Sequence, residues 1–168
     1  MSPTGTSDGA DAVLVRAAEA EVLTSDPAGS ITLLADSDTS GGALTSNRAL
    51  LREGSVGAPP HYHTRCTELF FVLGGSLQVL TGERVLTLAE GDQLLVPPRL
   101  AHAFAPAPGS DADILVVFAP GMARFDYYRL LDRLQRGEAS PQDVLDSQER
   151  FDNHYIDSPV WREARATA

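Results

Sequence analysis

The stretch that decides the fold is HYHTRCTELFFVLGG, residues 61–75. It begins with two histidines separated by one residue, continues through Glu68 into a run of large apolar residues, and ends in a glycine pair. Side chains at positions i and i+2 of a strand point to the same face of the sheet. His61 and His63 would therefore project side by side, an arrangement that suits two ligands of one metal ion.

Glu68 lies an odd number of residues after His63, so on one straight strand it would face the other way. It can join the histidines only if residues 64–67 form a turn or a bulge. A further candidate ligand is His102, which follows a predicted strand and its turn. Three of the four histidines thus fall, with an acid, in two glycine-bounded blocks. Scattered surface or core histidines are the alternative explanation, and this clustering weakens it.

The composition bounds the class of protein. A chain of 168 residues with 43% apolar residues is typical of a single globular domain. The sequence contains no run of about 18 apolar residues, so we expect no membrane span. The N-terminus lacks the features of a secretory signal. The single cysteine, Cys66, excludes an intrachain disulfide and fits a cytoplasmic protein. With a net charge of −10 and no basic stripe, we expect no nucleic-acid partner.

Short apolar runs alternate with turn signals between residues 43 and 118, which is typical of a β-sandwich or barrel. The sequence TGE at 81–83 predicts a tight hairpin turn. The prolines at 97 and 98 predict the end of a strand, because proline cannot donate a hydrogen bond to a sheet. Residues 31–42 predict a strand followed by a loop, whereas residues 11–25 are compatible with a strand or a short helix.

The pattern changes after Gly121. Four apolar residues recur at helical spacing and predict a helix that ends near Gly137. They are Phe125, Tyr128, Leu131 and Leu134. This apolar face must cover the chain's own barrel or a partner. A second helix is expected to begin at Ser140, where SPQD supplies a capping serine, a proline at the first helical position and an acid.

These patterns divide the chain into three parts. We predict a flexible N-terminal tail over residues 1–12, a β-barrel over 13–121 and a C-terminal helical segment over 122–168. His154 is expected in this helical segment, as a structural or surface residue.

Two blocks of the sequence resemble the motifs of the cupin superfamily. Residues 57–75 are similar to the first motif, with a histidine pair, a glutamate five residues later and a closing glycine. Residues 91–102, GDQLLVPPRLAH, are similar to the second motif, with a glycine, a proline and a histidine five residues after the proline. The resemblance implies an all-β jelly roll, the double-stranded β-helix barrel of cupins, with a C-terminal helical appendage. It also implies the metal ligands His61, His63, Glu68 and His102.

The chain departs from these motifs at three positions. Arg99 stands where the second motif usually has glycine, so a turn with positive φ is less favourable there. Pro106 replaces the asparagine that usually trails the second motif, and Ser55 replaces a glycine ahead of the first. These departures affect the expected shape of the loops and leave the four ligand positions intact.

Other side chains near the motifs have two interpretations. Phe70 shares the pleat face of Glu68 and Phe104 that of His102, so both are predicted to bind substrate, with plain core packing as the alternative. Cys66 is a less favoured ligand, because the histidine and carboxylate set is already complete. Arg99 lies near the barrel mouth, where it is solvated or holds an anionic group.

The overall layout resembles the quercetin-dioxygenase-like bacterial monocupins. This resemblance implies a dioxygenase with one divalent metal ion, in which Glu68 is both ligand and proton acceptor. Fe(II) is favoured, while Mn, Ni or Zn would suit the same ligands. The implied substrate is a small aromatic or enolisable molecule that chelates the metal, and the implied assembly is a homodimer. The alternatives are a metal-dependent isomerase or cyclase, for example of an aromatic polyketide pathway, and a non-catalytic small-ligand-binding cupin.

Overall fold

The computed structural model describes residues 11–166, and the predicted N-terminal tail lies outside them except for its last two residues. The strands are β1 (Val22–Ser25), β2 (Gly29–Ala35), β3 (Thr45–Leu51), β4 (Ala58–Tyr62), β5 (Thr67–Thr81), β6 (Arg84–Ala89), β7 (Gln93–Val96), β8 (His102–Pro106), β9 (Ala112–Ala119) and β10 (His154–Tyr155). The helices are α1 (Phe125–Gln135), α2 (Pro141–Asp146), α3 (Gln148–Phe151) and α4 (Pro159–Ala166).

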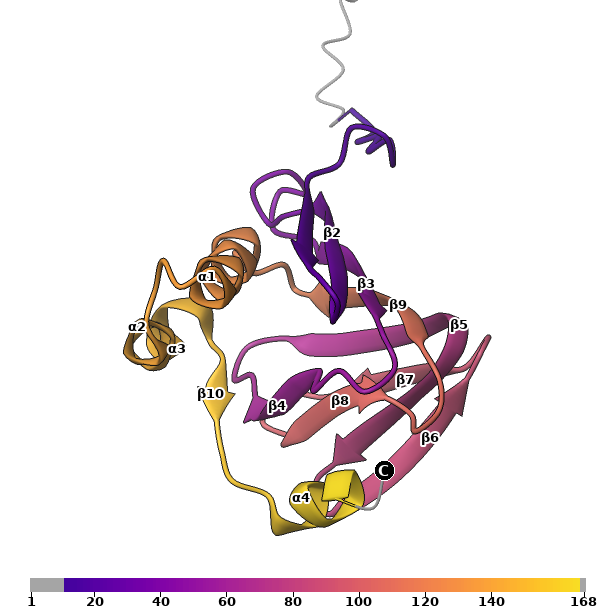
Figure 1. Cartoon of the computed structure of the whole chain (residues 1–168). Helices are drawn as coiled ribbons and strands as arrows, with labels where there is room; N and C mark the ends of the chain where they lie inside the picture. The colour runs from indigo at the N-terminus through magenta and orange to yellow at the C-terminus, as the bar shows by residue number, and fades with distance from the viewer. Residues whose placement is uncertain (1–10, 167–168) are drawn as a thin grey trace, which may run out of the picture.

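The strands form one antiparallel sheet that curls around its own interior (Figure 1). Strand β5 belongs to both halves of this sheet, since its first part pairs with β7 and β9 and its second part with β6 and β8. The register shifts between Val72 and Gly74, where the strand passes from one half to the other. Gly75 has a φ of 72°, and a Cβ there would lie 2.0 Å from the carbonyl oxygen of Asp111. The glycine pair therefore permits this passage, which a side chain at position 75 would block.

The core lies between the two halves of the sheet. Alternate side chains of β5 and β9 point inward and are almost completely buried, as the two-residue period of a strand requires. The core cluster includes Phe70, Val72, Leu77, Val79, Ile114, Val116 and Phe118. The predicted fold class, an all-β cupin barrel with C-terminal helices, is confirmed.

Several local predictions are also confirmed. A two-residue turn at 82–83 joins β5 to β6, with Thr81 paired to Arg84. Strand β7 ends at Val96, directly before the proline pair. Ser140 caps α2, and its side chain and that of Asp143 form a reciprocal capping box. The ambiguous segment ahead of residue 26 contains the short strand β1.

The C-terminal helices cover the chain's own barrel at two places. Helix α1 packs over β1 and β2, where its predicted apolar face joins a cluster with Leu23, Ile31 and Leu33. Helix α4 lies at the opposite end of the molecule, where Trp161 packs on Leu80 and two alanines of β8 (Figure 1). Of the two roles predicted for the apolar face of α1, the structure therefore shows the first.

The prediction that His154 lies in a helix is wrong. Helix α3 is followed by Asp152 in a left-handed conformation, and the chain then extends as β10 along the edge of β4. The edge of β4 offers unpaired backbone groups, and pairing with them outweighs the weak helix preference of the sequence NHY. The His154 ring stacks on Tyr62, with ring centroids 5.1 Å apart.

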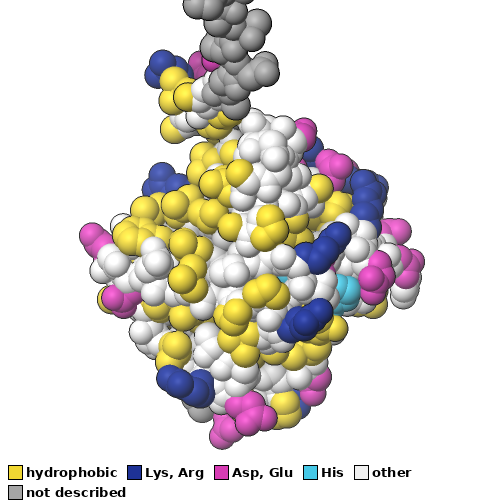
Figure 2. Space-filling view, turned by 180° about the vertical axis from the view of Figure 1, so that it is seen from behind, with side chains coloured by type: hydrophobic (Ala, Val, Ile, Leu, Met, Phe, Trp, Pro, Cys, Tyr) yellow, Lys and Arg dark blue, Asp and Glu magenta, His cyan; other side chains and the backbone are white. Residues whose placement is uncertain are grey.

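None of the helices between residues 11 and 166 has the length and apolar character needed to cross a membrane. On the face that Figure 2 shows, the basic side chains lie apart from one another and do not gather into one patch.

Removal of the chain after Gly121 should lower both solubility and stability. The truncation uncovers apolar side chains of β1 and β2 at one place and Leu80 at another, and exposed apolar patches promote aggregation. Soluble yield, the thermal midpoint and binding of a hydrophobic dye would measure the effect. A chain cut after Ser158, which loses only α4, should be affected less. A fully soluble and equally stable truncate at Gly121 would contradict the prediction.

Candidate metal centre

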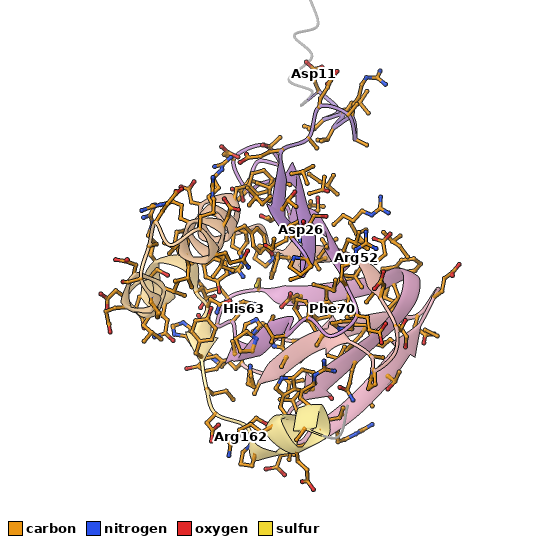
Figure 3. All side chains as sticks on the ribbon, in the orientation of Figure 1. Asp11, Asp26, Arg52, His63, Phe70 and Arg162 are labelled. Atoms are coloured by element: carbon orange, nitrogen blue, oxygen red, sulfur yellow. The ribbon has the colours of Figure 1, made fainter. Side chains whose placement is uncertain are left out.

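The three histidines and the glutamate of the two sequence blocks meet on the inner face of the sheet. His61 of β4 and His102 of β8 are directly paired in the antiparallel register, so their side chains are cross-strand neighbours. His63 follows the end of β4, and Glu68 is the second residue of β5. The ring centroid of His61 lies 4.3 Å from that of His102 and 5.0 Å from that of His63. Figure 3 shows His63 on the side of the barrel that faces β10, with Phe70 further inside.

One possible ligand atom from each of these four residues lies within 4.8 Å of all the others, and all four side chains are buried. The turn that this grouping requires is present. Strand β4 ends at Tyr62 and β5 begins at Thr67, and the intervening residues leave the strand conformation. Glu68 can therefore face the same way as the histidines.

The orientation of each ring is fixed by a backbone carbonyl. The Nδ1 atoms of His61, His63 and His102 lie 2.7, 2.6 and 2.9 Å from the carbonyl oxygens of Pro59, Asp152 and Leu100, respectively. A carbonyl oxygen can only accept, so each Nδ1 carries the proton and donates it. In a neutral ring this leaves Nε2 with a lone pair, which is the arrangement expected of metal-binding histidines.

The Nε2 lone pairs point to a common centre. Nε2 of His63 lies 3.1 Å from Oε2 of Glu68, and Nε2 of His102 lies 2.7 Å from the same oxygen. Against the effect of burial, the adjacent carboxylate of Glu68 raises the pKa of His102. When all three rings are neutral, as metal ligands must be, their Nε2 atoms and the carboxylate oxygen are all acceptors, and a shared cation would satisfy them together. Histidine nitrogen and carboxylate oxygen also form the donor set of many divalent transition-metal sites. The group could therefore hold one such ion.

The ionisation of two of these residues matches what a metal ligand requires. Burial, reinforced by the neighbouring His102 and His63, lowers the pKa of His61 well below its ordinary value. Burial alone would raise the pKa of Glu68, but contacts with His102 and His63 outweigh it and hold this pKa well below its ordinary value. Near neutral pH His61 is therefore neutral and Glu68 ionised, which are the ligand forms of these side chains.

Asp152 of the C-terminal segment holds the turn between His63 and Glu68. Its carbonyl accepts the hydrogen bond of His63, and its carboxylate accepts from the backbone N–H groups of Thr64 and Arg65, at 3.0 Å each. Burial opposes ionisation of this carboxyl, yet the hydrogen bonds from Thr64, Arg65 and His154 lower its pKa to about 2. No sequence motif marks Asp152, because the residues that it holds, His63, Thr64 and Arg65, lie 87–89 residues away.

A cavity of about 360 Å³ opens onto this centre, a volume in the range of small-molecule sites. His61 and Glu68 form part of its wall, together with Phe104. Side chains of β1, β2, β3 and α1, most of them apolar, form much of the remaining wall, together with residues 55–59 and parts of the C-terminal segment. Phe70 is completely buried and packs against Phe104, with ring centroids 4.9 Å apart. Phe104 thus lines the cavity directly, whereas Phe70 supports it from the core.

Two further residues of the sequence blocks lie apart from the ligand cluster. Arg99 has a φ of 68°, so it adopts the left-handed turn for which the second motif usually has glycine. Its backbone N–H donates to the carbonyl of His63, 2.6 Å away. Cys66 is buried with its sulfur 3.2 Å from that of Met122, and burial raises the pKa of its thiol to about 12. A protonated thiol is a poor metal ligand.

The cavity also contains polar residues that sequence reasoning missed. Arg124 and Asn153 line it, as do Tyr127, Tyr128 and Tyr155. They belong to the C-terminal segment, outside both motifs. Only the helical spacing at Tyr128 gave a signal for any of them, and it indicated packing.

Comparison with known proteins agrees with this geometry. Residues 47–118 match the family described as "Cupin domain". No curated protein matches the chain.

Solved structures share the fold at low sequence identity. KdgF from a Halomonas species is 20% identical, with a TM-score of 0.58 over 70% of this chain and 99% of KdgF. An RmlC-like cupin from Shewanella frigidimarina NCIMB 400 is 18% identical, with a TM-score of 0.54 over 70% of this chain and 96% of the cupin.

The hydroxypropylphosphonic acid epoxidase of S. wedmorenis is 18% identical, with a TM-score of 0.54 over 64% of this chain and 59% of the epoxidase. A structure described as the iron(II) form, FeII HppE, gives a TM-score of 0.55 at 20% identity, over 64% of this chain and 60% of HppE. Similarity at these identities concerns the fold alone. Together with the family match and the paired motifs, it leads to one conclusion: residues 47–118 form a cupin domain, and the chain has the cupin fold.

Proposed function

We propose that this cupin is a metal-dependent dioxygenase acting on a small aromatic or enolisable molecule that chelates the metal. One observation carries the proposal: His61, His63, His102 and Glu68 direct their ligand atoms to one point at the wall of a largely apolar cavity. An apolar cavity with a few convergent polar groups is the usual form of a small-molecule site.

Iron(II) is the favoured metal, with manganese, nickel or zinc as the other ions that suit these ligands. Histidine and carboxylate ligands with open coordination positions are common in non-haem iron enzymes that use oxygen. The iron(II) form of the structurally similar epoxidase and the resemblance to quercetin-dioxygenase-like monocupins support the same choice. A bound ion would supply Lewis acidity and open positions for substrate oxygen.

The protein's own residues have three roles in this proposal. His61, His63 and His102 hold the ion, with their rings fixed by backbone carbonyls. Phe104 offers an aromatic face to the substrate ring, and the apolar wall excludes water. Glu68 accepts a proton from a substrate hydroxyl or carbon acid, for which its ionised state and its place in the cavity wall suit it.

Replacing both His61 and His63 with alanine should remove most of the bound metal, because two of four ligands are lost. Metal per chain, measured by elemental analysis of the purified protein, tests this. The matched control is His154→Gln, which changes the one histidine outside the cluster and should retain the metal. Near-stoichiometric metal in the double variant would refute the proposed site.

The substitution Glu68→Gln should separate the role of ligand from that of base. Glutamine keeps the size and one acceptor oxygen but cannot take a proton at neutral pH. We expect turnover per bound metal to fall by roughly 10²- to 10⁴-fold, the usual scale of general base catalysis. Metal content and rate must be measured on the same preparation. Unchanged turnover per metal would show that Glu68 acts only as a ligand.

An oxygen electrode tests the reaction class. With flavonols and diketones as candidate substrates, a dioxygenase consumes one molecule of oxygen for each substrate. Conversion of substrate without oxygen uptake would instead indicate a metal-dependent isomerase or cyclase. Retention of a ligand without turnover would indicate a binding protein. The homodimer that small cupins commonly form stays part of the proposal and can be tested by light scattering.

A further inference from the structure

The guanidinium of Arg124 is the feature of the cavity that the proposed chemistry leaves unused. Arg124 is only 3% exposed, lines the cavity and carries a permanent positive charge. Within residues 11–166 no carboxylate forms an ion pair with this side chain. A buried charge is strongly destabilising unless it is paired and hydrogen-bonded, so this arginine requires an explanation.

The hydrogen bonds of the guanidinium are incomplete. Nη1 donates to the carbonyl of Phe151 at 3.2 Å, and Nη2 donates to Oδ1 of Asn153 at 3.1 Å. The Tyr128 hydroxyl lies beside the guanidinium and donates to Asn47. Nε of Arg124 and Nδ2 of Asn153, however, are buried donors without an acceptor. Both side chains line the same cavity. A ligand with acceptor oxygens could therefore satisfy these two donors.

The nearby acids of the protein are engaged elsewhere. Asp36 accepts hydrogen bonds from the backbone N–H groups of Arg124 and Phe125 at the start of α1. Asp132 is paired with Arg136 on the same helix. Asp152 is bound to the turn between the metal ligands. The negative charge of Glu68 also acts on Arg124, but the Oε2 atom of Glu68 lies 2.7 Å from Nε2 of His102 and 3.1 Å from Nε2 of His63. Among the described residues, none of these four acids forms an ion pair with Arg124.

Aromatic rings surround the guanidinium and connect it to the metal centre. Its central carbon lies 4.3 Å from the ring centroid of Tyr127, 5.4 Å from that of Tyr128 and 4.9 Å from that of Phe118. The Phe118 ring in turn contacts His63, with centroids 5.4 Å apart. The rings exclude water, and electrostatic attraction is stronger in such surroundings. The Phe118 ring therefore separates Arg124 from His63, one of the proposed metal ligands.

We propose that Arg124 and Asn153 bind a carboxylate group of the substrate. The substrate is then a small organic acid whose carboxylate lies between these donors and the metal centre. Its apolar body lies along the wall formed by Leu23, Ile31 and Leu131. Two donors on planar groups suit the two oxygens of a carboxylate. The inference rests on the proposed function, for which it names the substrate class.

Calorimetric titration with two probes tests the inference without turnover. Salicylate carries an aromatic ring, a chelating hydroxyl and a carboxylate, and salicylamide is its neutral counterpart of nearly equal size. The wild-type protein, with its metal content measured, should bind salicylate at neutral pH about 10- to 100-fold more tightly than salicylamide, the scale of a buried charge-assisted pair. Equal affinities, or no binding of either probe, would overturn the inference.

Asn153→Asp is the decisive variant, because it places a carboxylate beside Arg124 within the protein. It keeps the acceptor for Nη2, satisfies the guanidinium and removes the Nδ2 donor. We expect a thermal midpoint at least as high as that of the wild type, with salicylate binding weakened about tenfold or more and salicylamide binding little changed. Equal loss of both probes, or no loss of either, would mean that the pair is only structural.

A second pair of variants distinguishes loss of the charge from loss of the fold. Arg124→Gln removes the charge and should remove the preference for salicylate. Arg129→Gln is the matched control, since Arg129 lies five residues further on in α1, is exposed and bonds Glu21 and Asp126 instead of lining the cavity. The control should keep the preference. Charge selectivity that survives in Arg124→Gln would overturn the inference, whereas the proposed function fails separately if the wild type holds no metal.

Discussion

Three hydrogen bonds from buried histidine rings to backbone carbonyls determine how the candidate site is built. Each bond fixes one ring through Nδ1, and the second nitrogens of His63 and His102 lie 3.1 and 2.7 Å from Oε2 of Glu68. Two of the carbonyls, of Pro59 and Leu100, lie two residues before the histidine that they orient, so short local geometry supplies them. The third, of Asp152, comes from the C-terminal segment. The geometry of the candidate site therefore depends on both the barrel and the segment that follows it.

The sequence predicted the barrel and the four clustered residues because both leave short-range patterns. Alternation of apolar side chains identifies the strands. His61, His63 and Glu68 are close in the sequence and also lie close together in the fold. The requirement for a turn before Glu68 also followed from the odd number of positions between His63 and Glu68, because side chains alternate along a strand. Predictions based on such local rules held at the hairpin, at the proline pair and at the capping box of α2.

The remainder of the site could not be predicted, because it depends on contacts between residues distant in the chain. Asp152 reaches the turn at Thr64 across 88 residues, and nothing near either residue indicates the partner. Arg124 precedes a helix whose apolar spacing indicated packing alone. The sequence around His154 predicted a helix, because helix and strand propensities do not include the pairing of this segment with the edge of β4. Arg99 shows the opposite case, in which tertiary contacts hold a residue in a backbone conformation that its side chain disfavours.

The hydrogen bond between His63 and Asp152 has a thermodynamic consequence. A cation bound through His63 and the docked state of the C-terminal segment share this one contact, so each stabilises the other by the same free energy. Metal loading would therefore slow opening of the segment, and a protease acting at the exposed connection between α1 and α2 would cleave the loaded protein more slowly than the metal-free one. The rate of proteolysis in the C-terminal segment would therefore indicate whether the site holds a metal ion.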